Sequence, residues 1–318
     1  MTDPGPTWNQ LPVPYATPLT LLEHPEWQAA GVQVLLKRDD LLFLPSHPEI
    51  CGNKWRKLWG TLRALDGSGK NTMVTMGGPH SNHLVALAAA GNLLGLRTTG
   101  WIRGEWLAGE SPTLDRAVAY GMAIRFLSRD AYRQLRTAPP EFLAAEAGDS
   151  LFVPEGGTNG YSDLGMESLM REMTQEFPEE VLRSGTLQVA VPVGTGGTLR
   201  GMNRYNDHGL TLLAIPVLRG MDLPFTSNRI VWAATHHLGG YARYHAGMVT
   251  FMTAFYDQHG VVLDPIYTGK MMYALDQLIR SGHFPGGTKV LAIHTGGLQG
   301  IHAFNRRFGC NLPLPEVV

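Results

Sequence analysis

The chain is organised around residues 52–83, which begin Gly52-Asn53-Lys54-Trp55-Arg56-Lys57 and end Met76-Gly77-Gly78-Pro79-His80-Ser81-Asn82-His83. In each run a glycine turn precedes a stretch whose apolar residues recur at helical spacing. The short apolar segment 71–76 between them is typical of a buried strand. The pattern therefore predicts strands that end in glycine turns and open helices, with Lys54 at the mouth of such a turn.

The composition is that of a soluble globular protein with room for one large domain or two medium ones. The chain has 318 residues, of which 44% are apolar and 17% charged, and this excludes a disordered chain. The net charge of −1 argues against nucleic acid or an anionic membrane as a partner. Two cysteines, with no metal-binding spacing, predict neither a disulfide scaffold nor a metal site.

No apolar run reaches 18 residues, and the first residues show no basic segment followed by an apolar core. We therefore expect no membrane span and no signal peptide, and a cytoplasmic location. Residues 1–20 are proline-rich and are expected to lie extended on the surface.

Predicted strands alternate with predicted helices along the rest of the chain. The strands are expected at 32–40, 71–76, 97–102, 123–127, 152–154, 187–193, 210–217, 229–233 and 289–293. The helices are expected at 54–65, 83–94, 111–120, 164–177, from 199, 248–259 and 271–281, with 130–149 partly helical. This order predicts an α/β fold with mostly parallel, twisted sheets flanked by helices on both faces. Glycine loops follow the strands at 77, 156, 194 and 296, where ligands bind in such sheets.

Residues Gly194-Thr195-Gly196-Gly197-Thr198 join a strand to a helix. Small residues at a helix start leave backbone N–H groups able to ring a phosphate. The dinucleotide fingerprint fails because Leu199 stands where its third glycine belongs, and the P-loop pattern fails as well. The segment predicts a phosphate cup without a nucleotide signature; the alternative is an ordinary strand-to-helix turn.

Lys54 is the lysine best placed for imine chemistry, which requires a partly desolvated amine. Lys70 lies in a polar loop, Lys289 is expected at the surface, and Lys37 lies in a strand beside charges. Lys57 is one turn further along the helix and is expected either near the pocket or at the surface. A surface lysine at a helix start remains the alternative for Lys54.

Four further residues are candidates for contacts with a planar cofactor and its substrate. Asn82 could donate to a ring oxygen, and Ser81 could hold a carboxylate or carry a proton; both could instead be plain helix caps. Tyr267 could lie over an aromatic ring, and Thr295 could place a neutral hydroxyl on a ring nitrogen. The alternatives are surface packing and a simple turn.

Together these stretches resemble the pyridoxal-phosphate (PLP) enzymes of fold type II, the tryptophan-synthase-β type. The resemblance is strongest to the branch of D-cysteine desulfhydrase and 1-aminocyclopropane-1-carboxylate (ACC) deaminase. It rests on segments that keep the family's order from about residue 30 onward: 52–58, 77–83, 154–157, 194–198, 264–270 and 294–297.

The resemblance implies a two-domain enzyme. The larger domain, 1–53 and 160–318, would bind the PLP phosphate, and the smaller, 54–159, would carry the lysine and the Ser-Asn loop. Lys54 would bond the cofactor covalently, Asn82 would bind its ring oxygen and residues 194–198 its phosphate.

The remaining implied roles concern the substrate and proton transfer. Ser81 would meet the substrate carboxylate, with His80 and His83 beside it, and Tyr267 would stack on the ring or assist proton transfer. Thr295 would face the ring nitrogen. A homodimer is implied by the resemblance alone.

Two departures bear on the substrate. ACC deaminases have a glutamate facing the ring nitrogen where this chain has Thr268, and His80 replaces a glutamine. A neutral hydroxyl weakens the ring as an electron sink, which suits α,β-elimination of a good leaving group. The prediction is a lyase that releases ammonia and a 2-keto acid from a small amino acid, D-cysteine first and ACC as the alternative. A non-catalytic protein that binds a phosphorylated metabolite is the alternative of another class.

Overall fold

The computed structural model describes residues 11–65, 68–106, 109–221, 223 and 225–315. The chain forms two compact units, each with its own parallel sheet. The first comprises Met1–Tyr15 and Phe43–Gly165, and the second comprises Ala16–Leu42 and Met166–Val318. The first unit thus contains the whole predicted range 54–159 together with flanking segments.

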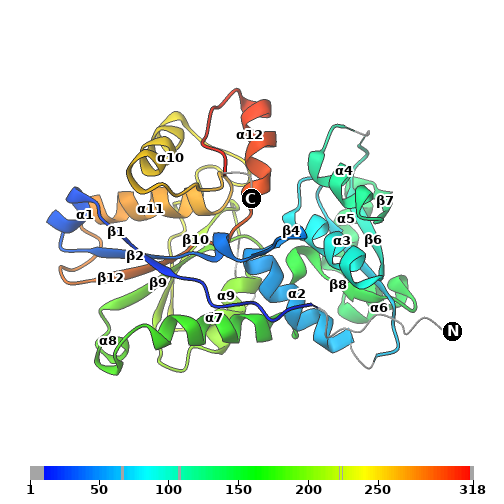
Figure 1. Ribbon diagram of the computed structural model, residues 1–318, viewed down its shortest axis with the longest axis horizontal. Helices are drawn as coiled ribbons and strands as arrows, with labels where there is room; N and C mark the ends of the chain where they lie inside the picture. Colours follow the sequence, from blue (N-terminus) through cyan, green and yellow to red (C-terminus); the bar gives the residue numbers. More distant parts are fainter. Residues whose placement is uncertain (1–10, 66–67, 107–108, 222, 224, 316–318) are drawn as a thin grey trace. The chain divides into compact units, whose positions relative to one another are not determined.

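The second unit is built on a six-stranded sheet in the order β1-β2-β12-β9-β10-β11 (Figure 1). It is parallel except at one edge, where β1 runs antiparallel to β2. Its strands are β1 (Leu19–Leu22), β2 (Gln33–Lys37), β9 (Leu187–Val193), β10 (Thr211–Pro216), β11 (Ile230–Trp232) and β12 (Lys289–Ile293). Because β12 pairs with both β2 and β9 in parallel, the loops that follow β9 and β12 emerge at the same edge.

Alternate residues of this sheet face opposite layers of helices, as the period of a strand requires. Val290 and Ala292 belong to a core with helices from one face, whereas Leu291 and Ile293 belong to a core on the other. The first layer contains α1 (Pro25–Ala29), α10 (Ala246–His259), α11 (Thr268–Arg280) and α12 (Ile301–Phe308). The second contains α7 (Asp163–Gln175), α8 (Glu179–Arg183) and α9 (Gly197–Arg204). Burial of both faces explains why these strands are continuously apolar.

The first unit contains a four-stranded parallel sheet in the order β7-β6-β5-β8. Its strands are β5 (Thr72–Gly77), β6 (Arg97–Arg103), β7 (Ala123–Leu127) and β8 (Leu151–Val153). A separate antiparallel hairpin, β3 (Phe43–Leu44) and β4 (His47–Cys51), leads directly into α2 (Gly52–Leu65).

Helices cover both faces of the smaller sheet. On one face, Val74, Met76 and Trp101 pack with α5 (Arg129–Thr137) and α6 (Pro140–Ala147). On the other lies α3 (Asn82–Leu94), an alanine-rich helix that is buried along most of its length. α4 (Pro112–Ala119) begins as its Ser-Pro sequence predicts, because the Ser111 hydroxyl accepts a hydrogen bond from the Leu114 N–H at 3.2 Å. Short 3₁₀ turns form η2 (Asp39–Leu41), η3 (Glu155–Gly157) and η4 (Leu298–Gly300).

The predicted α/β fold with mostly parallel sheets is confirmed. The structure adds elements that the sequence did not predict, namely β1, α1, the hairpin, α8 and α12. Pro48 lies inside β4, and a proline argues against a strand except in an edge position such as this two-stranded hairpin provides. Of the segment expected to be extended, 1–10 lie outside the described residues, and Leu19 already begins β1. Across the described ranges, no helix has the length and apolarity needed to cross a membrane.

Candidate active site

The predicted site residues fall in both units, and each group is described within its own unit. Lys54 lies in the first turn of α2, directly after the hairpin strand β4. The helix starts at Gly52 with a φ of 52°, a conformation that favours glycine. Lys54 is half-buried, and its Nζ donates to the Asn53 Oδ1 at 3.1 Å. The next residues, Trp55 and Arg56, are buried, so this helix start lies inside the unit and Lys54 is not a fully exposed surface lysine.

Ser81 and Asn82 lie at the carboxyl end of β5, where α3 begins. A tight turn brings them there, with the Ser81 N–H donating to the Gly78 carbonyl at 3.1 Å. Gly77 permits this turn, because a Cβ there would lie 2.9 Å from Leu84 and 3.2 Å from the Ser81 Cβ. Ser81 occupies the N-cap position but makes no side-chain capping bond. Its half-buried hydroxyl therefore does not perform the cap role that was its alternative.

His80 is half-buried beside the start of α4. Its Nδ1 lies 3.5 Å from the Ser111 hydroxyl, and its ring meets Trp106 edge-on at 5.3 Å between centroids. His80 thus projects from the same turn as Ser81, from the side where α4 starts.

His83 is buried, with 1% of its surface exposed. Its contact with a substrate remains a prediction. Its Nε2 lies 3.0 Å from the Thr75 hydroxyl, which itself donates to the Val153 carbonyl at 2.7 Å. Thr75 has one proton to give, so it must accept from His83, and Nε2 carries the hydrogen. Nδ1 then presents a bare lone pair, and it has no hydrogen-bond partner among the described residues. Burial, followed by the charges of Lys54 and Lys57, lowers the pKa of His83 to about 3.

Lys57 is buried, at 3% exposure, and contacts the loop that follows β8. Its Nζ donates to the Gly156 carbonyl at 3.0 Å and to the Thr158 hydroxyl at 3.3 Å. On the outer side of this loop, the Tyr132 hydroxyl donates to Glu155 at 2.8 Å. Lys57 and Tyr132 thus both hold this loop through hydrogen bonds. The sequence left Lys57 either near the pocket or at the surface, and the structure places it in the interior.

The predicted phosphate cup of the second unit lies between β9 and α9. Gly196 has a φ of 83° and precedes the first helical residue, Gly197. Gly197 and Thr198 are buried, whereas Thr195 is exposed. The loop therefore forms a left-handed glycine turn at a helix N-terminus, a geometry suited to an anion.

Tyr267 lies directly against this cup. A Cβ on Gly194 would be 2.9 Å from the Tyr267 Cε1 atom, so only glycine leaves room for the ring. The backbone of Tyr267 is held by Asp264, a carboxylate that is 2% exposed. Asp264 Oδ2 accepts from the N–H groups of Ile266 and Tyr267, both at 2.9 Å. The structure thus brings Tyr267 and the glycine cup together.

Thr268 has its hydroxyl engaged within the same turn. The hydroxyl donates to Asp264 Oδ1 at 2.8 Å and accepts from the Asp264 N–H at 2.9 Å, and the residue is fully buried. The Thr268 hydroxyl thus bonds Asp264 as both donor and acceptor.

Thr295 follows β12 at the edge where β9 ends, and it is 6% exposed. Its neighbour His294 fixes the turn: Nε2 lies 2.8 Å from the Val262 carbonyl and must carry the hydrogen. Nδ1 then accepts from the Gly296 N–H at 3.3 Å. Gly296 and Gly297 both have positive φ, of 75° and 88°, so the sequence Thr-Gly-Gly forms a tight left-handed turn beside the cup's sheet edge.

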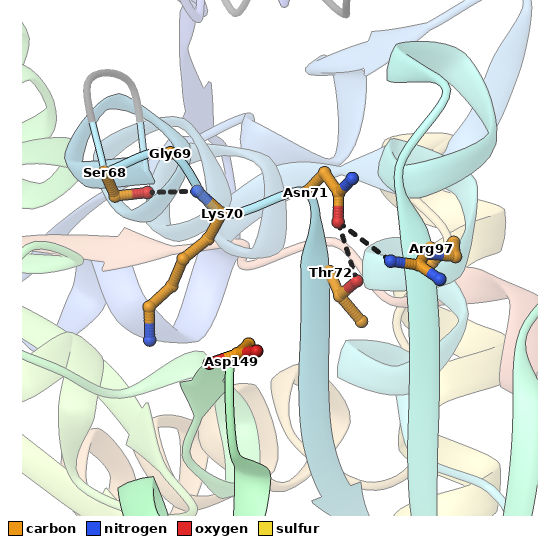
Figure 2. A pocket seen from close by; sticks show the side chains of 7 residues that line it. All are labelled: Ser68, Gly69, Lys70, Asn71, Thr72, Arg97 and Asp149. Carbon is orange, nitrogen blue, oxygen red and sulfur yellow. Dashed lines mark hydrogen bonds between the residues drawn. The ribbon is translucent and has the colours of Figure 1, made fainter.

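A polar cavity of about 440 Å³ lies elsewhere in the first unit (Figure 2). It is lined by Ser68, Gly69, Lys70, Asn71, Thr72, Arg97 and Asp149. Thr72 and Arg97 begin β5 and β6, so the cavity lies at the amino ends of these strands, whereas Ser81 follows the carboxyl end of β5. Lys70 donates to the Ser150 carbonyl at 3.0 Å and lies apart from the predicted lysine site.

Taken unit by unit, the described side chains are of the kinds that a PLP cofactor requires. Lys54 offers a half-buried amine, Gly194 leaves room for an aromatic ring against the cup, and Thr295 offers a neutral hydroxyl at the adjoining loop. These are the groups that a planar aldehyde with a phosphate ester needs: an amine, an aromatic contact, backbone N–H donors and a ring-nitrogen partner.

Comparison with known proteins identifies the family. The sequence pattern of the family described as "Pyridoxal-phosphate dependent enzyme" matches residues 11–218. The bifunctional D-cysteine desulfhydrase/ACC deaminase of Arabidopsis thaliana is 28% identical, covering 86% of this chain and 74% of its own. The D-cysteine desulfhydrase of Salmonella paratyphi A is 25% identical, covering 86% and 90%. A crystal structure of an ACC deaminase homologue matches with a TM-score of 0.72 at 26% identity, covering 93% of each chain. The chain therefore belongs to the family of pyridoxal-phosphate-dependent enzymes.

Proposed function

We propose that the protein is a lyase that removes ammonia from a small amino acid by α,β-elimination. D-cysteine is our leading candidate substrate. The relatives named D-cysteine desulfhydrase and ACC deaminase support this substrate class. The products would be a 2-keto acid, ammonia and the β-substituent; D-cysteine and water would give pyruvate, hydrogen sulfide and ammonia.

One observation favours elimination over opening of a cyclopropane ring, namely the engagement of Thr268 by Asp264. With this hydroxyl committed and no glutamate at position 268, the neutral Thr295 is our candidate partner for the ring nitrogen. A neutral partner leaves that nitrogen less protonated and the ring a weaker electron sink. A weak sink suffices when the electron pair of the broken Cα–H bond forms a Cα=Cβ double bond while a good leaving group such as thiolate departs with the electron pair of its bond to Cβ. ACC lacks such a group and is our second candidate substrate.

PLP supplies an aldehyde that condenses with amines and draws electrons from the substrate's Cα. We assign the other tasks to the chain itself. Lys54 would hold the cofactor through its amine, and the same amine would remove the Cα proton. Ser81, whose hydroxyl makes no cap bond, binds the substrate carboxylate, with His80 on the same turn beside it.

The remaining roles concern cofactor contacts and support. Asn82 donates to the ring oxygen, residues 194–198 bind the phosphate through backbone N–H groups, and Tyr267 covers the ring and helps to move protons. For His83, whose imidazole is buried, we favour a supporting role beneath Lys54 over the direct substrate contact expected from sequence.

The test is a screen for keto acid and ammonia release from D-cysteine, L-cysteine, β-chloroalanine, serine and ACC. The proposal expects D-cysteine and β-chloroalanine to react fastest. Turnover of ACC alone would favour the second candidate, and no keto acid from any of them would refute both. A homodimer in the cytoplasm also remains a prediction, and light scattering coupled to size exclusion tests the dimer.

A further inference from the structure

A buried lysine of the second unit has no task in the proposed reaction. Lys270 lies in the first turn of α11 and is 0% exposed. Its Nζ donates to the His237 carbonyl at 3.0 Å and to the Gly240 carbonyl. Buried lysines usually pair with carboxylates; this one is bonded to two backbone carbonyls of a single loop.

That loop has an unusual backbone. Leu238, Gly239, Gly240 and Ala242 all have positive φ, of 50°, 85°, 109° and 53°. The left-handed region disfavours residues that have a Cβ, so Leu238 and Ala242 require other contacts to hold them there. Of the two carbonyls that meet Lys270, one belongs to His237, directly before this stretch, and the other to Gly240 within it. An ammonium with several donors is suited to bind both.

The loop also contacts the segment beside the phosphate cup. A Cβ on Gly240 would lie 3.2 Å from the Cβ of Arg219 and 3.3 Å from its backbone nitrogen. Two residues further on, the Met221 Cε is 3.6 Å from the position of a Cβ on Gly196, as is the Leu223 Cδ2. Contacts therefore run from Lys270 through Gly240 to Arg219, and Met221 and Leu223 lie against the middle of the cup.

The same lysine is connected to the cup through its own helix. Tyr267 precedes Lys270 by three residues, about one helical turn, and its ring lies against Gly194. Lys270 thus supports the cup from two sides. Burial lowers its pKa to about 8, so the amine remains mostly protonated at neutral pH and keeps all its donors.

We propose that Lys270 is a positioning residue whose ammonium fixes the 237–242 loop and, through Arg219, Met221 and Leu223, the walls of the phosphate cup. The first half of this proposal concerns the loop alone. The second half rests on the proposed function, because it takes residues 194–198 as the binding site of the PLP phosphate.

The test replaces the ammonium by a methyl group of similar reach in Lys270→Met. The control is Lys289→Met, which removes a lysine of the same unit whose Nζ bonds a side chain, Gln33, at 2.9 Å. Arg243 is an exposed residue beside the loop, so trypsin cleavage after it, followed by mass spectrometry on the cofactor-free protein, reports loop opening. A titration with PLP, followed by absorbance, reports the cup.

We expect Lys270→Met to be cleaved after Arg243 at least about tenfold faster than wild type, since it loses two charge-assisted hydrogen bonds. We also expect its PLP dissociation constant to rise about five- to tenfold, with Lys289→Met unchanged in both measurements. Wild-type cleavage in Lys270→Met overturns the proposal, and an opened loop with unchanged PLP affinity overturns its second half. If Lys270→Met does not fold, Lys270→Gln, which keeps N–H donors without the charge, carries the same comparison. Absence of PLP binding in the wild type would defeat the proposed function, while the cleavage measurement would still decide the role of Lys270.

Discussion

The imidazole of His83 packs directly against Gly157. A Cβ on Gly157 would be 2.9 Å from the Nδ1 of His83 and 3.0 Å from its Cε1. Gly157 also has a φ of 72°, so both its conformation and its surroundings require glycine. This contact joins the loop after β8 to α3, next to the helix that carries Lys54.

Gly157→Ala should therefore destabilise the protein by about 2–4 kcal/mol, combining the cost of a left-handed alanine with overpacking against a buried ring. The measurement is urea unfolding followed by circular dichroism. Gly160→Ala is the matched control three residues along, because a Cβ there meets nothing within 4 Å. Equal stability of the two variants would contradict the contact.

His83 should make stability depend on pH below neutrality. Its pKa is lowered from 6.5 to about 3 in the folded state, so between these values the unfolded chain binds the proton that the folded chain refuses. Unfolding free energy should thus rise with pH across this window and be lost as pH falls from 6.5 towards 3. Between pH 7 and pH 5 the loss should be about 2 kcal/mol. His83→Gln should remove this part of the slope; an unchanged slope would show that other groups cause it.

The parallel sheets and the loops at their carboxyl ends could be predicted from sequence, because most of the strands are apolar and glycine turns follow four of them, at 77, 156, 194 and 296. α2, α3 and the cup before α9 follow from this pattern. The hairpin before α2 could not be predicted, because its prolines argue against strands. It forms as a separate pair of edge strands. Ser81 could be placed at a helix start, but only the structure shows that its hydroxyl makes no cap bond.

The burial of Lys57 and Lys270 could not be predicted, because their partners, backbone carbonyls above all, are distant in the sequence. Lys57 meets Gly156, 99 residues away, and Lys270 meets His237, 33 residues away. Every residue has a backbone carbonyl, so the sequence does not show which carbonyl will bind a lysine. The strained residues Leu238 and Ala242 give no local signal either, since leucine and alanine ordinarily avoid positive φ.

Gly194→Ala should weaken cofactor binding, because the added Cβ would push the Tyr267 ring away from the cup. We expect the PLP dissociation constant to rise about tenfold or more, as overpacking of 1–3 kcal/mol would produce. Gly286→Ala, at an exposed glycine of the same unit with nothing within 4 Å of a Cβ, should bind PLP as the wild type does. Tight binding by Gly194→Ala would contradict the ring contact.

Thr268→Val should affect stability before it affects substrate choice. The substitution keeps the shape but leaves Asp264 with an unpaired N–H and one acceptor bond fewer, at a cost of about 1–3 kcal/mol. Thr253→Val removes a hydroxyl that bonds the Val249 carbonyl at 3.2 Å on half-buried α10, and should cost less. Urea unfolding compares the two. A Thr268→Val protein of wild-type stability with an altered ratio of D-cysteine to ACC turnover would instead place this hydroxyl at the substrate.

Lys54→Ala should abolish the absorbance of the lysine–cofactor imine and lower kcat/KM by at least about 10²–10⁴-fold, the range for loss of a positioned proton acceptor. The spectrum and the rate must fall together, because one amine is assigned both tasks. Lys70→Ala is the control: its Nζ bonds the Ser150 carbonyl at the amino ends of the strands, in the cavity of Figure 2, and both measurements should match the wild type. If Lys54→Ala kept the imine absorbance, another lysine would have to carry it. The buried Lys57 on the same helix face would then be the next residue to replace, since it too lies close enough to lower the pKa of His83.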